Sequence, residues 1–124
     1  MTSWLAVGAG GAIGAMSRHA LNGIIQRLSP VAEFPLGIFL INVGGSAAIG
    51  LVAGLAASGR LSLSADTRLF VTAGILGGFT TFSSFSLDTL LLLRSGHPLL
   101  AALNVAGQVF ISLLAVAIGY RLAH

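Results

Sequence analysis

The sequence predicts an all-α integral membrane protein of four transmembrane helices, the third of them broken, assembled as an antiparallel homodimer with dual topology. Of its 124 residues, 56% are hydrophobic and 7% are charged, whereas about a quarter are charged in an ordinary soluble domain. A chain this short cannot bury so much apolar surface in one aqueous core. We therefore expect a multi-pass protein of the cell membrane, with the lipid bilayer as its solvent.

The apolar residues form four uncharged stretches separated by polar, turn-forming segments. A bilayer core about 30 Å thick is crossed by roughly 20 helical residues, so each stretch is long enough for one crossing. We expect a single transmembrane domain over residues 1–124, with helices near 4–26, 36–58, 67–93 and 98–121. The first stretch lacks the basic start of a signal peptide and is followed by further apolar spans, so we expect it to stay in the chain.

The arginines are divided almost equally between the two sides of the membrane. With four crossings, both termini and the second loop share one side, and cytoplasmic loops normally collect positive charge. The near tie favours neither orientation, so we expect both to be inserted and opposed copies to pair. The side with the termini carries Arg60, Arg68 and Arg121, and the other side carries Arg27, Arg94 and, if its side chain reaches the interface, Arg18.

Glycine is abundant, with 17 residues, and two pairs have the spacing that lets helix backbones approach closely in lipid. Gly10 and Gly14 form one pair, and Gly50 and Gly54 form the other. Such pairs serve contacts within one subunit or between two subunits. Both uses remain open at this point.

Several function classes are disfavoured by what the chain lacks. It has no cysteine, no pair of neighbouring carboxylates and only three scattered histidines, so we expect neither an enzyme nor a side-chain metal cluster. Its net charge of +3 forms no basic patch, and no nucleic-acid partner is expected. The glycine-rich string of residues 7–14 lacks the strand and βαβ unit of a phosphate-binding loop.

The third stretch contains the most informative segment, "GILGGFTTFSSFSLD" at 74–88. It gathers glycines, threonines and serines, which compete with regular helix, so we expect a break near 77–81. Non-helical backbone at membrane depth is tolerated where protein or a water-filled cavity surrounds it, and in transporters such breaks hold ions. A packing kink is the alternative explanation of the break taken alone.

Neutral polar side chains recur on the other stretches. Asn42 and Ser46 are four residues apart, and Asn104, Gln108 and Ser112 repeat at the same interval. Residues four apart share a helix face, so these side chains either hydrogen-bond helices to one another or line an ion path. Close to the expected break, Ser83 and Ser84 add hydroxyls, while Phe82 and Phe85 share one face.

Charged residues within the stretches are few and lie near their ends. Arg18 is late in the first and Asp88 late in the third, where each caps a helix, reaches the interface or lies at the mouth of a pore. Small four-span drug exporters use a carboxylate deep in the first helix, and this chain has none there. A passive path of neutral donors is favoured over a proton-coupled pump.

Four strings together resemble the CrcB/Fluc family of fluoride channels over nearly the whole chain. They are "GAIGAMSR" (11–18), "PLGIFLINVGGS" (35–46), "GGFTTFSSFSLDT" (77–89) and "GYRL" (119–122). The resemblance implies passive export of fluoride, which limits its accumulation in the cytoplasm, through an antiparallel homodimer with two pores. It also implies one structural sodium ion, not transported, at the centre of the dimer.

The resemblance assigns roles to residues of this sequence. The backbone carbonyls of Gly77 and Thr80 would coordinate the sodium, a chemically sensible donor set for a hard cation. Phe82 and Phe85 would present their electropositive ring edges to the anion. Asn42 would donate an amide N–H to fluoride, and the donor path would continue through Ser83, Ser84 and Ser112. Arg18, Asp88, Asn104 and Gln108 are further candidates for the pore or its mouth.

Four positions depart from the family pattern and affect the outer donor path. Ile38 stands where threonine is frequent, Ser84 also where threonine is frequent, Asp88 where glutamate is usual, and Gln108 where a small or hydroxylated residue is expected. The "GGFTTF" string that carries the sodium and phenylalanine assignments is unbroken. We therefore expect a fluoride channel, with a dual-topology proton-coupled exporter of cations or drugs, or a non-transporting membrane assembly subunit, as the alternatives.

Overall fold

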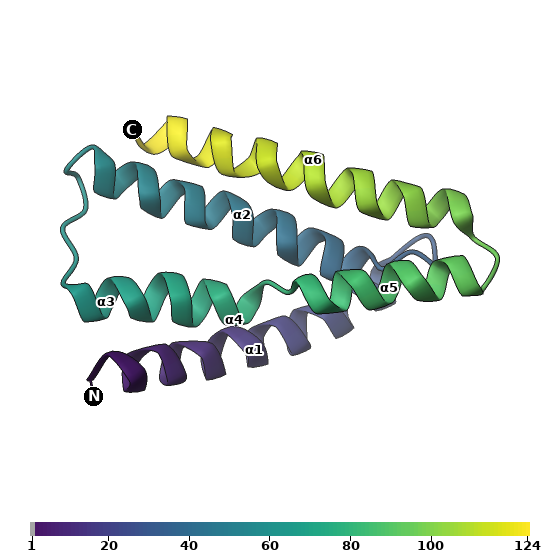
Figure 1. Ribbon diagram of the computed structural model, residues 1–124, viewed down its shortest axis with the longest axis horizontal. Helices are drawn as coiled ribbons and strands as arrows, with labels where there is room; N and C mark the ends of the chain where they lie inside the picture. The colour runs from purple at the N-terminus through teal and green to yellow at the C-terminus, as the bar shows by residue number, and fades with distance from the viewer. Residues whose placement is uncertain (1) are drawn as a thin grey trace.

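The computed structural model describes residues 2–124, which form helices joined by short connections and contain no strand (Figure 1). The helix η1 is π-helical and the others are α-helical. Along the chain the elements are α1 (Thr2–Leu28), α2 (Leu36–Ala57), α3 (Ala65–Leu69), η1 (Phe70–Leu76), α4 (Gly77–Phe79), α5 (Phe82–Arg94) and α6 (Pro98–Ala123). The short elements α3, η1, α4 and α5 follow one another along one line, which we call the third rod.

Three segments are long and apolar enough to cross a membrane: Leu36–Ala57, Ala65–Arg94 and Pro98–Ala123. These correspond to α2, the third rod and α6. The remaining helix, α1, has 27 residues but is less apolar, because polar residues gather between Ser17 and Arg27. The protein is therefore all-helical over the described residues, with three apolar candidate spans.

The helices lie roughly side by side, with α2 between α6 and the third rod (Figure 1). The most extensive packing joins α2 to α6, while α1 packs on the other side of the third rod, against η1 and α4. Both termini lie at the same end of the molecule as the connection between α2 and α3. Arg60 and Arg121 belong to this end, and Arg27 and Arg94 close helices that finish at the opposite end.

Glycine sets the closest helix contacts within the subunit. A Cβ on Gly10 would lie 2.9 Å from the Cα of Gly74 and closer still to the carbonyl of Phe70. Gly14 meets the carbonyl of Ile75 in the same way. Gly50 and Gly54 press against the backbone of α6. Both small-residue pairs are thus used between helices of one chain, which decides the question left open by their spacing.

Helix ends follow the local sequence. Ser64 caps α3 by accepting a hydrogen bond from the Thr67 N–H at 3.2 Å. Pro98 occupies the first turn of α6, where its missing N–H costs nothing. Gly59 and Gly96 adopt φ of +73° and +79° just after α2 and α5, a left-handed conformation that glycine adopts without strain. These ends position the connections at the two faces of the bundle.

The third rod changes its backbone twice. Over Phe70–Leu76 it is π-helical, a widened geometry that is often found at functional sites. After α4 the backbone is extended at Thr80 (φ −83°, ψ 159°) and Thr81 (φ −156°, ψ 120°), and α5 begins at Phe82. The two extended residues lie inside the interval 77–81 that the sequence singles out.

Candidate functional site

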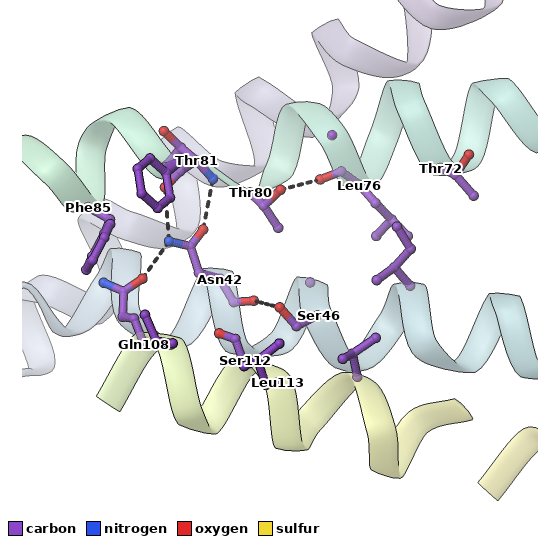
Figure 2. A pocket seen from close by; sticks show the side chains of 16 residues that line it. Asn42, Ser46, Thr72, Leu76, Thr80, Thr81, Phe85, Gln108, Ser112 and Leu113 are labelled. Atoms are coloured by element: carbon purple, nitrogen blue, oxygen red, sulfur yellow. Dashed lines mark hydrogen bonds between the residues drawn. The ribbon is translucent and has the colours of Figure 1, made fainter. Parts of the chain in front are cut away.

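A groove of about 490 Å³ opens between α2, the third rod and α6, beside the extended residues (Figure 2). We call it the central groove. Its walls are mostly apolar, with amide and hydroxyl groups between them, and carry no charged side chain. The lining residues are Asn42, Gly45, Ser46, Ile49, Thr72, Leu76, Gly77, Thr80, Thr81, Phe82, Phe85, Gln108, Val109, Ser112, Leu113 and Val116.

Asn42 on α2 pairs with the backbone of Thr81 through both ends of its carboxamide (Figure 2). Its Oδ1 accepts the Thr81 N–H at 2.8 Å, and its Nδ2 donates to the Thr81 carbonyl at 3.0 Å. Thr81 is 9% exposed, so its backbone groups need partners inside the protein. The side chain of Asn42 supplies the bonds that a regular helix would have made.

The same arrangement removes the helical partners of two carbonyl groups. In a continuous helix the N–H of Thr81 would bond the carbonyl of Gly77, but it donates to Asn42 instead. Likewise the N–H of Ser84 donates to Thr81 Oγ1 at 3.2 Å and does not bond the carbonyl of Thr80. Gly77 and Thr80 therefore present carbonyl oxygens without their helical donors.

Asn42 also begins a row of side-chain hydrogen bonds that runs away from the groove. Nδ2 of Asn42 donates to Gln108 Oε1 at 2.7 Å, Nε2 of Gln108 donates to Asn104 Oδ1 at 3.0 Å, and Nδ2 of Asn104 donates to Thr89 Oγ1 at 3.0 Å. The row ends where the Thr89 hydroxyl donates to the carbonyl of Phe85 at 2.8 Å. We call Asn42, Gln108, Asn104 and Thr89 the polar row.

The hydrogen bonds of Asn42 bear on its expected role as an N–H donor to fluoride. Its Nδ2 carries two hydrogens. One is used by the carbonyl of Thr81 and the other by Gln108 Oε1. In this conformation Asn42 has no free N–H for an anion, so donation to an ion requires one of these two bonds to be given up.

The two phenylalanines differ in exposure although both line the groove. Phe82 is 77% exposed and Phe85 is 7% exposed. Their ring centroids lie 5.2 Å apart with an interplanar angle of 59°, a tilted arrangement that turns a ring edge toward the neighbouring ring. Phe85 packs within the subunit, whereas Phe82 projects from it.

Most hydroxyl groups in the groove already donate a hydrogen bond to a backbone carbonyl nearby in the chain. Ser46, Thr72 and Thr80 donate to the carbonyls of residues four positions earlier, at 2.7, 2.8 and 2.9 Å. Figure 2 draws no such bond at Ser112, whose hydroxyl is therefore available in the groove among the residues drawn. Ser112 is the hydroxyl best placed to meet a ligand.

Ser83 and Ser84 are not among the residues that line the central groove. Both surround the N-terminal cap of α5, where the Thr81 hydroxyl lies 3.2 Å from each of their hydroxyl oxygens. Asn104, which is fully buried, also lies behind the groove wall as part of the polar row.

The charged candidates do not line the groove either. Neither Arg18 on α1 nor Asp88 on α5 lines it. Asp88 is half-buried, and its Oδ2 has no hydrogen-bond partner among the described residues. The described residues contain no group of three or more His, Asp or Glu side chains that would hold a metal ion.

The structure thus gathers Asn42, Gly77, Thr80, Phe82, Phe85, Gln108 and Ser112 around one groove. Sequence reasoning missed Thr81 and Thr89, whose groups complete the hydrogen-bond arrangement. For Thr81 the signal was its residue type at the start of a helix, because a threonine hydroxyl there can accept a hydrogen bond from a backbone N–H of the first turn.

A family model described as CrcB-like protein, Camphor Resistance (CrcB) matches residues 5–120. The chain belongs to the CrcB family. Curated relatives of this CrcB-family chain include fluoride-specific ion channel FluC 2 of Nitrobacter hamburgensis, 48% identical over 98% of this chain and 97% of the relative. The FluC channels of Paramagnetospirillum magneticum and Thermus thermophilus are 47% and 43% identical, covering 97% and 98% of this chain and 94% and 95% of theirs.

Membership of the CrcB family confirms the resemblance noted in the sequence. The relatives carry the names of ion channels, in agreement with the expectation that the chain is not an enzyme. Together with the apolar helices, they identify a multi-pass protein of the cell membrane.

Proposed function

We propose that this CrcB-family chain is a fluoride-selective channel that lets fluoride leave the cell passively. The observation that carries the proposal is the central groove, whose lining combines Phe82, Phe85, Asn42 and Ser112 without a fixed charge. Neutral donors and ring edges replace part of the hydration shell of a small anion, yet bind it weakly enough to release it. Relatives at 43–48% identity are named fluoride-specific ion channels.

The working unit is an antiparallel homodimer with dual topology, in which α1 provides the fourth crossing and the third rod is broken at Thr80 and Thr81. Exposure of 77% at Phe82, on a groove that opens at the subunit surface, supports a site that a second copy completes. The nearly equal numbers of arginines at the two ends support insertion in both orientations.

A structural sodium ion at the dimer centre is the further part of the proposal. The residues fit such an ion, because Gly77 and Thr80 both have carbonyl oxygens that lack their helical donors. Two subunits related by a two-fold axis would offer four oxygens of the type that hard cations prefer. When bound, the ion would hold the two extended segments together.

The proton-coupled exporter receives no support from the groove. Such a pump needs a titratable group in the transport path, and Asp66 and Asp88, the two carboxylates of the third rod, do not line the groove. The neutral lining favours passive movement down the gradient of the anion.

Fluoride release from liposomes tests the proposal. Purified protein should release fluoride, but not chloride, when a potassium ionophore opens a shunt. Phe82→Ile and Phe85→Ile should each reduce the rate at least about tenfold, the effect of losing roughly 1.4 kcal/mol of ion stabilisation. Leu114→Ile, on the exposed side of α6, is the matched control and should leave the rate unchanged. Vesicles of wild-type protein that retain their fluoride would refute the channel.

A further inference from the structure

The side chain of Gln108 connects the central groove to the interior of the subunit. It lines the groove, is 5% exposed and forms two hydrogen bonds, one through each end of its carboxamide. Its Oε1 faces Asn42, and its Nε2 faces Asn104.

The oxygen of Gln108 occupies the place that an anion bound to Asn42 would take. Of the two hydrogens on Asn42 Nδ2, one is fixed by the Thr81 carbonyl, whose bond also keeps the extended backbone satisfied. The other points to Gln108 Oε1 at 2.7 Å. This second hydrogen is the one that can be released without leaving a buried backbone group unpaired.

The rest of the polar row fixes the orientation of the Gln108 amide. Turning the amide over would bring its NH₂ group against the NH₂ group of Asn42 and its oxygen against Asn104 Oδ1, so two favourable contacts would become repulsive. All donors in the row point the same way, from Asn42 toward the carbonyl of Phe85, and bonds so aligned polarise one another. The oxygen of Gln108 is therefore held toward Asn42.

We propose that Gln108 is a positioning residue that acts as an internal competitor for fluoride: its side-chain oxygen holds the Asn42 amide, and an anion binds at Asn42 by displacing that oxygen. The inference rests on the proposed channel function. An anion is a stronger acceptor than a neutral amide oxygen, so displacement is favourable once the ion has entered the groove. The cost of breaking the neutral bond sets the fluoride concentration at which the site fills.

The decisive variant is Gln108→Met, which nearly preserves the side-chain length and replaces the amide oxygen with a thioether sulfur, a much weaker acceptor. The fluoride concentration giving half-maximal flux in liposomes should fall roughly two- to tenfold, the range expected for removing one competing hydrogen bond. Gln108→Ser, whose short hydroxyl cannot reach Asn42, should shift it in the same direction. In an Asn42→Ala background, Gln108→Met should cause no further shift. Leu114→Met, an exposed position on the same helix, is the matched control.

A spectroscopic measurement separates positioning from a general effect on packing. With ¹⁵N-labelled asparagine in detergent-solubilised protein, one Asn42 side-chain proton should move upfield in Gln108→Met without fluoride and return downfield as sodium fluoride is added. In the wild type the same proton should start downfield. Suppose that wild-type protein conducts fluoride, but that the variants match it both in the fluoride concentration giving half-maximal flux and in the Asn42 resonances. The inference about Gln108 would then be wrong, while the proposed channel function would stand. If wild-type protein does not conduct, the channel itself fails.

Discussion

At the scale of single residues, Asn42 is the centre of the site because it makes three hydrogen bonds with one carboxamide. Two of them replace backbone bonds lost at Thr81, and the third connects to the polar row. An asparagine suits this place, since it offers an acceptor and a two-hydrogen donor on a short side chain. The same group therefore supports the extended backbone and contacts the groove.

Asn42→Ala should lower both stability and fluoride flux. It leaves the N–H and the carbonyl of Thr81 buried without partners, at about 1–3 kcal/mol for each group. Thermal unfolding of the purified protein in detergent should show a lower midpoint than wild type. Asn22→Ala on α1 removes a half-buried carboxamide that takes part in none of these bonds, so its midpoint should stay close to that of wild type. Equal midpoints for the two variants would contradict the assigned role of Asn42.

The sequence predicts which residues line the groove better than it predicts the contacts that these residues make. Residue type and spacing single out Asn42, Gln108 and Ser112, because a polar side chain in an apolar helix stands out. Spacing along separate helices does not say that Asn42 meets Thr81, which is 39 positions away. For the same reason neither the use of both Asn42 hydrogens nor the contacts of Ser83 and Ser84 with the Thr81 hydroxyl could be predicted.

At the scale of elements, the contact between α1 and the third rod depends on the absence of side chains. Gly10 and Gly14 lie against η1 and α4, and on the third rod Gly78 lies against the backbone of Gly11.

The expected helix ranges end within two residues of the observed bounds, because proline, glycine and charged residues mark the ends. The π-helical turn of η1 was not predicted, since its composition is also that of an ordinary apolar helix.

Gly10→Ala should destabilise the protein and separate α1 from η1. The new methyl group would meet the backbone of Phe70 and Gly74, which cannot rotate away, and overpacking of this kind costs about 1–3 kcal/mol. Gly8→Ala on the same helix meets nothing within 4 Å and should be neutral or slightly stabilising, because alanine favours helix by up to about 1 kcal/mol. Thermal midpoints in detergent compare the two. The packing assignment fails if Gly8→Ala is the more damaging change.

At the scale of the whole molecule, the single subunit leaves its central groove open at the surface, with Phe82 projecting from it. In the proposed dimer, a second copy in the opposite orientation would cover this face and bring together the Gly77 and Thr80 carbonyls of both subunits. The direction in which each copy inserts into the membrane depends on how the arginines are distributed between the two ends of the molecule. Arg60 and Arg121 share the end with the termini, and Arg27 and Arg94 lie at the other.

Charge placed at one end should therefore fix the orientation and, by doing so, remove the antiparallel pair. Ser62→Lys with Leu122→Lys adds two charges at exposed positions at the end with the termini, and Val31→Lys with Ala32→Lys adds two at the opposite end. Since positive charge is retained in the cytoplasm, C-terminal reporter fusions should place the terminus inside for the first variant and outside for the second. Each variant expressed alone should lose fluoride flux.

Coexpression of the two oppositely biased variants should restore flux, because each supplies the orientation that the other lacks. The corresponding glutamine substitutions keep the side chains polar and add no charge, so they should insert in both orientations and conduct when expressed alone. A charge-biased variant that is held in one orientation and still conducts by itself would show that parallel subunits suffice. In that case the antiparallel assembly would be wrong.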